Sequence, residues 1–235
     1  MRLDKLDSDF LRYVAAGHFH TGDRLPSMEE LSAELKISVG KLREQLEVAR
    51  SLGLVDVRPR LGIRLEEYDF LPALRLSVMF ALASDPSRFQ AFSDLRNHLE
   101  AAFWHEAVTR LTEADHQYLH ELLRDAWAKL DGQPIQIPHA EHRALHLAIF
   151  SRMENPFVKG LLEAYWEAYE AVGLNVYSDY QYLREVWTFH ADIVNSIVAG
   201  NHETGYRLLC EHTHLLRHRE TAPPAVRLEP AGAAP

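Results

Sequence analysis

The sequence is poor in cysteine, with a single thiol, Cys210, among 235 residues. One thiol excludes an intrachain disulfide framework and a zinc site built from several thiolates, and it fits a reducing compartment. The chain also lacks an apolar run of about 18 residues, the length that a membrane-spanning helix needs, and its first residues lack the apolar stretch of a signal peptide. These absences predict a soluble cytoplasmic protein that has no membrane partner.

Positive charge is scarce as well, since 25 lysines and arginines face 34 aspartates and glutamates and leave a formal net charge of −9. This balance argues against indiscriminate binding to nucleic acid, although a chain total can hide a local basic patch. Residues 36–64 hold such a patch, with seven basic residues against three acidic ones. The basic residues are Lys36, Lys41, Arg43, Arg50, Arg58, Arg60 and Arg64.

Residues 1–66 carry the element order of a winged helix-turn-helix. Ser27, with Glu30 three residues later, is the capping box that starts a helix, and Ser38 is the N-cap of the next one. Apolar periodicity and turn residues predict the remaining boundaries. The predicted elements are helices over 9–16, from 27 onward and over 38–51, and strands over 55–57 and 63–65.

Polar and basic residues at the helix starts and on the hairpin are the candidate DNA contacts. Phosphate and major-groove contacts require cations at the start of a recognition helix and on a wing. The alternative is an ordinary solvated surface, because a local surplus of four charges is unremarkable by itself. Together with the element order, the charges predict double-stranded DNA as the partner. The candidate contacts are Ser27, Ser38, Lys41, Arg43, Arg60, Gly62 and Arg64.

The same region resembles the N-terminal domain of GntR-type transcription factors. The matching segments are Gly22-Asp23-Arg24-Leu25-Pro26-Ser27, Glu30-Leu31, Ser38, Arg43-Glu44, Leu46, Gly53-Leu54-Val55 and Pro59-Arg60-Leu61-Gly62. The chain departs from the family at Glu29, Val39 and Gln45, where arginine, arginine and alanine are usual. The resemblance implies a DNA-binding regulator that lacks two familiar DNA-contacting cations, at Glu29 and Val39.

Beyond residue 70 the pattern is helical throughout and contains little strand signal. Proline, glycine and asparagine interrupt it at short intervals, which predicts helices with short connections and therefore an antiparallel bundle. The predicted helices are 71–84, 87–110, 113–130, 138–152, 156–173, 179–199 and 203–218. The predicted fold class is mainly α, an N-terminal winged helix-turn-helix followed by an antiparallel all-helical bundle.

These patterns divide the chain into four parts. Residues 1–66 are the predicted DNA-binding domain and residues 67–74 the linker. Residues 75–218 are the predicted bundle that binds a metal and an effector. Residues 219–235, rich in alanine and proline, are predicted to be disordered.

Four histidines stand where the amphipathic pattern of three helices requires an apolar residue: His142, His146, His190 and His212. The first two are one helical turn apart. The other two lie ten residues before and twelve residues after Gly200, at similar heights in an antiparallel helix pair. A buried imidazole without a partner costs a few kcal/mol. The four residues therefore predict a metal site, unless ordinary hydrogen bonds satisfy them.

The bundle resembles the FCD-type ligand-binding domain of the FadR-like subfamily of GntR regulators. The metal site of that domain uses an aspartate, a histidine four residues later and two histidines on later helices. His146, His190 and His212 match the three histidines, whereas His142 stands at the aspartate position. The resemblance implies a divalent transition metal, and imidazole ligands favour zinc, with nickel as the second choice.

Arg96 lies in the apolar stripe of a predicted helix, and Glu100 follows one turn later. One interpretation is an intrahelical ion pair, worth about 0.3–0.5 kcal/mol on a surface. The other is a guanidinium that points into the bundle and holds the carboxylate of an effector. Arginines of the family at the matching position favour the second interpretation, and both remain open at this point.

These features predict a ligand-responsive transcription regulator rather than an enzyme. Four neutral imidazoles would leave the charge of the metal uncancelled, which favours a small organic acid as the effector. The resemblance and the two-fold geometry of helix-turn-helix proteins imply a homodimer on an inverted-repeat operator.

Two other functions fit parts of the pattern. A metal-dependent hydrolase needs a general base, and the acid adjacent to the cluster in sequence, Glu141, lies about 100° around the helix from His142. A direct metal sensor, in which the ion itself is the signal, needs no organic ligand.

Overall fold

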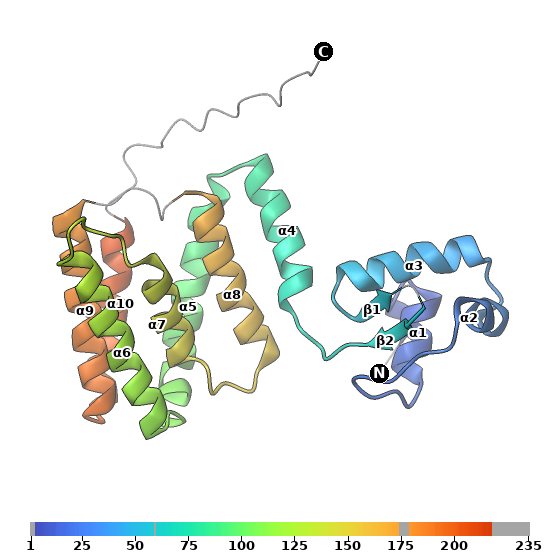
Figure 1. Cartoon of the computed structure of the whole chain (residues 1–235), viewed down its shortest axis with the longest axis horizontal. Coiled ribbons are helices and arrows are strands. Elements are labelled where there is room, and N and C mark those ends of the chain that lie inside the picture. The colour runs from blue at the N-terminus through green and yellow to red at the C-terminus, as the bar shows by residue number, and fades with distance from the viewer. Residues whose placement is uncertain (1–2, 59, 174–178, 218–235) are drawn as a thin grey trace, which may run out of the picture.

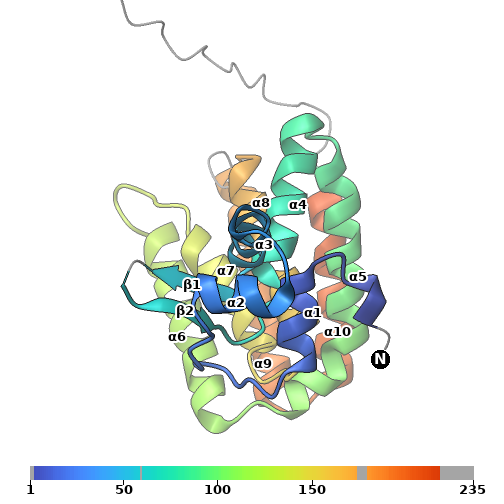
Figure 2. The ribbon, with the colours of Figure 1, turned by 90° about the vertical axis from the view of Figure 1, so that its right-hand side faces the viewer.

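The computed structural model describes residues 3–58, 60–173 and 179–217 and shows two lobes joined by a short segment (Figure 1). The smaller lobe holds the first three α-helices and a hairpin, and the larger lobe is a bundle of helices. Turned by 90°, the smaller lobe lies in front of the bundle, at one end of the long axis of the molecule (Figure 2). The predicted fold class is confirmed.

The smaller lobe is built around short, capped helices. Its elements are η1 (Leu3–Lys5), α1 (Asp9–Ala16), α2 (Met28–Leu35), α3 (Val39–Ser51), β1 (Val55–Arg58) and β2 (Gly62–Leu65). The Ser27 side chain accepts a hydrogen bond from the Glu30 backbone N–H, and the Ser27 backbone N–H donates to the Glu30 carboxylate, so α2 begins with a full capping box. Its core contains Phe10, Leu25, Leu31, Leu42, Leu46, Ala49, Val55 and Ile63.

The hairpin pairs β1 with β2 in antiparallel register, from Val55 opposite Leu65 to Arg58 opposite Gly62. Gly62 has a φ of 83°, in the left-handed region, and a side chain there would also meet the guanidinium of Arg24. Arg60 adopts a φ of 67° in the turn. Backbone hydrogen bonds join β2 to the loop before α2, from the Leu25 N–H to the Ile63 carbonyl at 2.9 Å and from the Gly22 N–H to the Leu65 carbonyl at 2.7 Å.

Gln45, one of the departures from the family pattern, has a structural role. Its Oε1 accepts hydrogen bonds from the Phe10 backbone N–H at 2.8 Å and from the Ser8 hydroxyl at 3.1 Å. Its amide donates to Asp9 at 3.1 Å. The side chain fastens α3 to the start of α1, which an alanine cannot do.

The larger lobe contains the remaining helices: α4 (Leu71–Ser84), α5 (Arg88–Thr109), α6 (Glu113–Leu130), α7 (His139–Ile149), α8 (Pro156–Ala171), α9 (Tyr180–Val198) and α10 (His202–Arg217). The predicted linker, residues 67–74, is wrong at its end, because α4 begins at Leu71. Pro72 sits in the first turn, where its fixed φ suits a helix start, and Leu71 is buried. The predicted disordered tail, residues 219–235, lies outside the described residues.

The bundle is held by pairwise helix packing. α10 packs on α9 and α5, α6 packs on α7 and α9, and α8 packs on α4 and α5. The main core is formed by buried side chains from α5 to α10, among them Trp104, Leu119, Leu145 and Trp187. In the described part of the chain, no helix is both long and apolar enough to cross a membrane.

Candidate functional site

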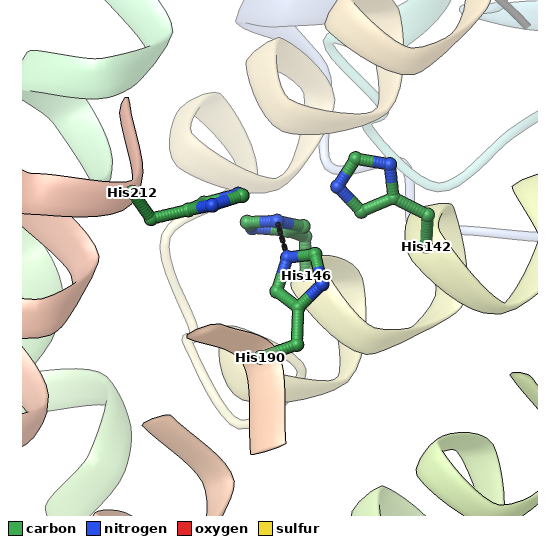
Figure 3. Close-up of side chains that lie close together, drawn as sticks. All are labelled: His142, His146, His190 and His212. Carbon is green, nitrogen blue, oxygen red and sulfur yellow. Dashed lines mark hydrogen bonds between the residues drawn. The ribbon is translucent and has the colours of Figure 1, made fainter. Parts of the chain in front are cut away.

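Three helices of the bundle bring four histidines to one point (Figure 3). His142 and His146 project from the same face of α7, His190 comes from α9 and His212 from α10. Gly200, with a φ of 71°, lies in the turn between α9 and α10. Its position leaves the rings of His190 and His212 with centroids 4.4 Å apart.

The spacing of the four rings suits a single ion. One ring nitrogen from each histidine lies within 4.8 Å of the other three, and Nε2 of His146 is 3.2 Å from Nε2 of His190. A Zn–N bond of about 2.0–2.1 Å places two nitrogens on one zinc at most about 4.2 Å apart. A small inward movement of the rings therefore brings all four nitrogens within bonding distance of one ion.

The cluster is buried and incompletely hydrogen-bonded. His146, His190 and His212 are at most 1% exposed, and although part of the His142 side chain reaches solvent, its Nε2 is buried. Among the described residues, no partner exists for Nε2 of His142, Nδ1 of His190 or either nitrogen of His212. Such nitrogens are costly unless something binds them. The donor set fits a metal by this test.

Burial keeps the four imidazoles neutral. It lowers the pKa of His142, His146 and His190 well below the usual value; Arg96 lowers all three further, and neighbouring imidazoles add to this effect for His142 and His190. The pKa of His212 falls to about 3 for the same first reason. Neutral imidazole is the form that binds metal, so protons do not compete for the site at neutral pH.

Arg96 on α5 lies directly against this cluster. Its Nε is 3.0 Å from Oε1 of Glu100, and its Nη2 is 2.8 Å from Nδ1 of His146. The guanidinium carbon lies 4.7 Å from the ring centre of Tyr165. Each interpretation of Arg96 is met in part. The intrahelical ion pair with Glu100 forms, and the guanidinium also points into the bundle and reaches the histidine cluster. The pair is at most 1% exposed, so the energy of a surface pair does not apply to it.

Glu100 belongs to the site, although the sequence suggested it only as a partner of Arg96. Its side chain is fully buried, with Oε1 3.3 Å from Nδ1 of His146. Burial raises its pKa to about 6, against the opposing effect of Arg96. The sequence feature that could have placed Glu100 in the site is its position one turn after Arg96, on the buried face of the same helix.

Glu141, the general base that a hydrolase would need, is engaged elsewhere. Its Oε1 forms an ion pair with Nζ of Lys129 on α6 at 2.6 Å. The acid that the described contacts place beside the cluster is Glu100, not Glu141.

The candidate DNA contacts lie on the smaller lobe and differ in whether their side chains already have partners. Arg43 and Arg60 are exposed and form no ion pair within the described ranges. Lys41 is paired with Asp9 at 2.8 Å, and Arg64 donates to the Gly22 carbonyl at 2.9 Å.

The other three candidates have local structural roles. The side chains of Ser27 and Ser38 accept the capping bonds of α2 and α3. Gly62 allows the wing turn. Among the cations, Lys41 would have to break its ion pair with Asp9 to contact a phosphate, whereas Arg43 and Arg60 form no ion pair among the described residues.

Comparison with known families matches both lobes. The model of the gntR family of bacterial regulatory proteins matches residues 11–65, and the model of the FCD domain matches residues 91–215. The second match spans the helices that carry Arg96, Glu100 and the four histidines.

Individual relatives agree with the family models. The chain is 24% identical over 201 residues to the HTH-type transcriptional regulator LutR of Bacillus subtilis, covering 80% of this chain and 87% of LutR. It is 28% identical over 151 residues to the uncharacterized HTH-type transcriptional regulator YcbG of the same organism, covering 64% of this chain and 61% of YcbG. The solved structure of Streptococcus agalactiae GntR has the same fold, with a TM-score of 0.65 at 19% identity, over 92% of this chain and 97% of that one. The matched families and curated relatives are transcription regulators, not enzymes.

Proposed function

This chain belongs to the GntR family of DNA-binding transcription regulators and carries an FCD domain, and we propose that this domain holds one divalent transition metal on His142, His146, His190 and His212. The observation that carries the proposal is the set of buried ring nitrogens without hydrogen-bond partners. We propose zinc first and nickel second, because imidazole suits both ions.

The alternative of ordinary hydrogen bonding accounts for less of the site. It satisfies the pair His146–His190, whose Nε2 atoms are 3.2 Å apart, but leaves His212 with two unsatisfied nitrogens. When bound, the ion supplies a centre of positive charge that neutral ligands do not cancel. Four protein ligands complete a tetrahedral zinc shell, so we propose that the effector binds beside the metal and not on it.

We propose a small organic acid as that effector, with Arg96 as the residue that holds its carboxylate. The guanidinium lies within hydrogen-bond distance of His146 and therefore at the edge of the metal site. A planar guanidinium matches a carboxylate better than an ammonium does.

We propose that the regulator acts as a homodimer on an inverted-repeat operator and belongs to the FadR-like subfamily. Its parts are then a DNA-binding domain over residues 1–66, a connection over 67–70 and the bundle from Leu71. Tyr165 on α8 contacts Arg96, α8 packs on α4, and α4 shares a cleft with α3 that Arg43 and Leu76 help to line. An acid that favours one arrangement of these helices would change the spacing of the two DNA-binding lobes.

The effector proposal is tested by a thermal-shift screen of small mono-, di- and hydroxycarboxylates on the metal-loaded protein. An acid at a hundredfold excess over its dissociation constant is expected to stabilise the wild type by about 2.7 kcal/mol. Arg96→Gln, compared with its own ligand-free state, is expected to lose most of this gain. Equal stabilisation of both proteins removes Arg96 from the effector site. An acid that stabilises the wild type without changing operator affinity contradicts the switch.

The DNA surface is tested by Arg43→Ala and Arg60→Ala. Each is expected to weaken operator binding and to reduce the slope of log affinity against log salt by up to about 0.9, the value of one phosphate contact. Both residues are exposed, so the melting temperature is expected to stay near that of the wild type. Arg124→Ala, an exposed arginine of α6, is the control and leaves the slope unchanged. Normal binding by both variants places the DNA contacts elsewhere.

A direct metal sensor is the second candidate, and the closed set of four protein ligands favours it. Operator binding that follows the metal concentration in the absence of any acid supports the sensor. Operator binding that follows the acid at constant metal supports the effector proposal.

A further inference from the structure

His146 presents its two ring nitrogens to different neighbours. Its Nε2 faces the histidine cluster, 3.2 Å from Nε2 of His190. Its Nδ1 faces α5, where Nη2 of Arg96 lies at 2.8 Å and Oε1 of Glu100 at 3.3 Å. Nδ1 thus lies between a guanidinium that can only donate a hydrogen bond and a carboxylate that can only accept one.

A neutral imidazole carries one proton, and the position of that proton decides which neighbour Nδ1 binds. With the proton on Nε2, Nδ1 accepts from Arg96, and Nε2 donates to His190. With the proton on Nδ1, that nitrogen donates to Glu100, and Nε2 keeps a free lone pair. Nε2 can bind a metal only in the second form, because a protonated ring nitrogen has no lone pair to offer.

Glu100 lacks the hydrogen bond that the second form supplies. Both of its oxygens are buried without a hydrogen-bond donor among the described residues, although Oε1 lies 3.0 Å from Nε of Arg96 as an ion pair. A buried carboxylate in this state is costly, and a donor at Nδ1 of His146 would satisfy one oxygen. A carboxylate behind a ligating histidine also fixes the orientation of the ring.

Arg96 keeps its place when it gives up His146. Its Nη1 donates to Oδ1 of Asn97 at 3.0 Å, its Nε remains beside Glu100, and its guanidinium remains over Tyr165. For Nη2, Nδ1 of His146 is the only hydrogen-bond acceptor within the described part of the chain. Loss of that acceptor leaves a buried N–H of a cation unsatisfied, which favours binding of an anion.

We propose that metal binding at Nε2 of His146 moves the hydrogen bond of Nδ1 from Arg96 to Glu100 and thereby frees Nη2 of Arg96 to hold a carboxylate oxygen. This inference rests on the proposed metal and effector sites. It adds an order of binding, in which the metal binds first and prepares the site for the acid. Glu100 is a positioning residue in this scheme, and His146 neither gains nor loses a proton. By linkage, the acid tightens metal binding by the same factor.

The tautomer of His146 tests the inference directly in the full-length wild type. Long-range ¹H–¹⁵N NMR of protein labelled with ¹⁵N-histidine distinguishes a protonated ring nitrogen from an unprotonated one, and His146→Gln identifies the signals. We expect the proton on Nε2 in metal-free protein and on Nδ1 after one equivalent of zinc is added. A proton on Nδ1 in both states, or on Nε2 in both, overturns the inference. Failure of the protein to bind zinc at all instead contradicts the proposed metal site.

Two substitutions are expected to affect zinc affinity differently. Glu100→Gln replaces the carboxylate behind His146 and is expected to weaken zinc binding by about 10–100-fold, as for other partners of ligating histidines. Arg96→Met removes the competing donor, and its zinc affinity is expected to equal or exceed that of the wild type. Glu167→Gln, which breaks the ion pair with Arg75 between α8 and α4, is the control and leaves zinc affinity unchanged. Equal weakening by Glu100→Gln and Arg96→Met overturns the competition.

Acetate is the probe for the freed guanidinium. It is expected to raise the melting temperature of zinc-loaded wild type and to leave that of the metal-free protein unchanged. Equal stabilisation of both forms overturns the proposed order of binding. Stabilisation of neither form overturns the release of Arg96.

Discussion

Replacement of His190 by alanine is expected to reduce the bound metal from about one equivalent per chain to near none, because the ligands of a single ion act together. His190 is the central member of the cluster. Its ring centroid lies 4.4 Å from that of His212, 4.7 Å from that of His142 and 5.2 Å from that of His146. Elemental analysis of protein purified without chelators measures the change.

The controls separate loss of a ligand from loss of structure. His142→Asp is expected to retain the metal, because a carboxylate oxygen is also a ligand and the FCD resemblance implies aspartate at this position. His139→Ala, on the same helix but hydrogen-bonded to Glu170, is expected to retain it as well. Unchanged metal content in His190→Ala contradicts the assignment of the site. Loss of metal from His142→Asp removes His142 from the ligand set.

Acid is expected to destabilise the metal-free protein strongly below about pH 6.5, the ordinary pKa of histidine. The pKa of all four cluster histidines is lower in the folded state, so the unfolded chain binds more protons as the pH falls. Each such histidine costs up to about 1.4 kcal/mol of unfolding free energy per pH unit below that value. For His212 the loss continues to about pH 3. The total reaches several kcal/mol by pH 5, a large part of the stability of a typical domain.

Two carboxyl groups with shifted pKa values also affect the pH dependence of stability, each in its own pH range. Glu100 has the opposite sign, because its pKa is raised from 4.5 to about 6, so the folded state gains relative stability as the pH falls through that window. One carboxyl cannot offset four imidazoles. Asp9 contributes only below its ordinary value of 3.8, since its ion pair with Lys41 lowers its pKa to about 2. The loss between pH 6.5 and 4.5 therefore belongs to the histidines.

Urea unfolding at fixed temperature and several pH values measures this effect. Metal-free protein is expected to lose unfolding free energy from pH 7 to 5, and a zinc-loaded sample is expected to hold its stability to lower pH, because the metal occupies the nitrogens that would take up protons. A flat profile for the metal-free protein means that the imidazoles are not neutral and buried as the structure places them.

The sequence determined the elements and the composition of the site through local patterns. Helix periodicity, the caps Ser27 and Ser38 and the break at Gly200 predicted helices whose observed ends differ by a few residues at most. The four-residue spacing of His142 and His146 placed both on one face of α7. The periodic spacing of apolar and polar residues depends only on neighbours in the sequence, so it can be interpreted without knowledge of the fold. The predicted linker, residues 67–74, overlapped the predicted helix 71–84, and the buried Leu71 at the start of α4 agrees with the helix.

Only the tertiary structure decided how the site is connected. The sequence left open whether Arg96 pairs with Glu100 or points into the bundle, whereas the structure places both side chains beside Nδ1 of His146 on α7. Likewise, the contact of α1 with α3 commits Lys41 to Asp9. These contacts join residues far apart in the chain through particular rotamers, which periodicity does not encode. The sequence therefore determined which helix faces are buried, and the packing of the helices decided which nitrogen meets which partner.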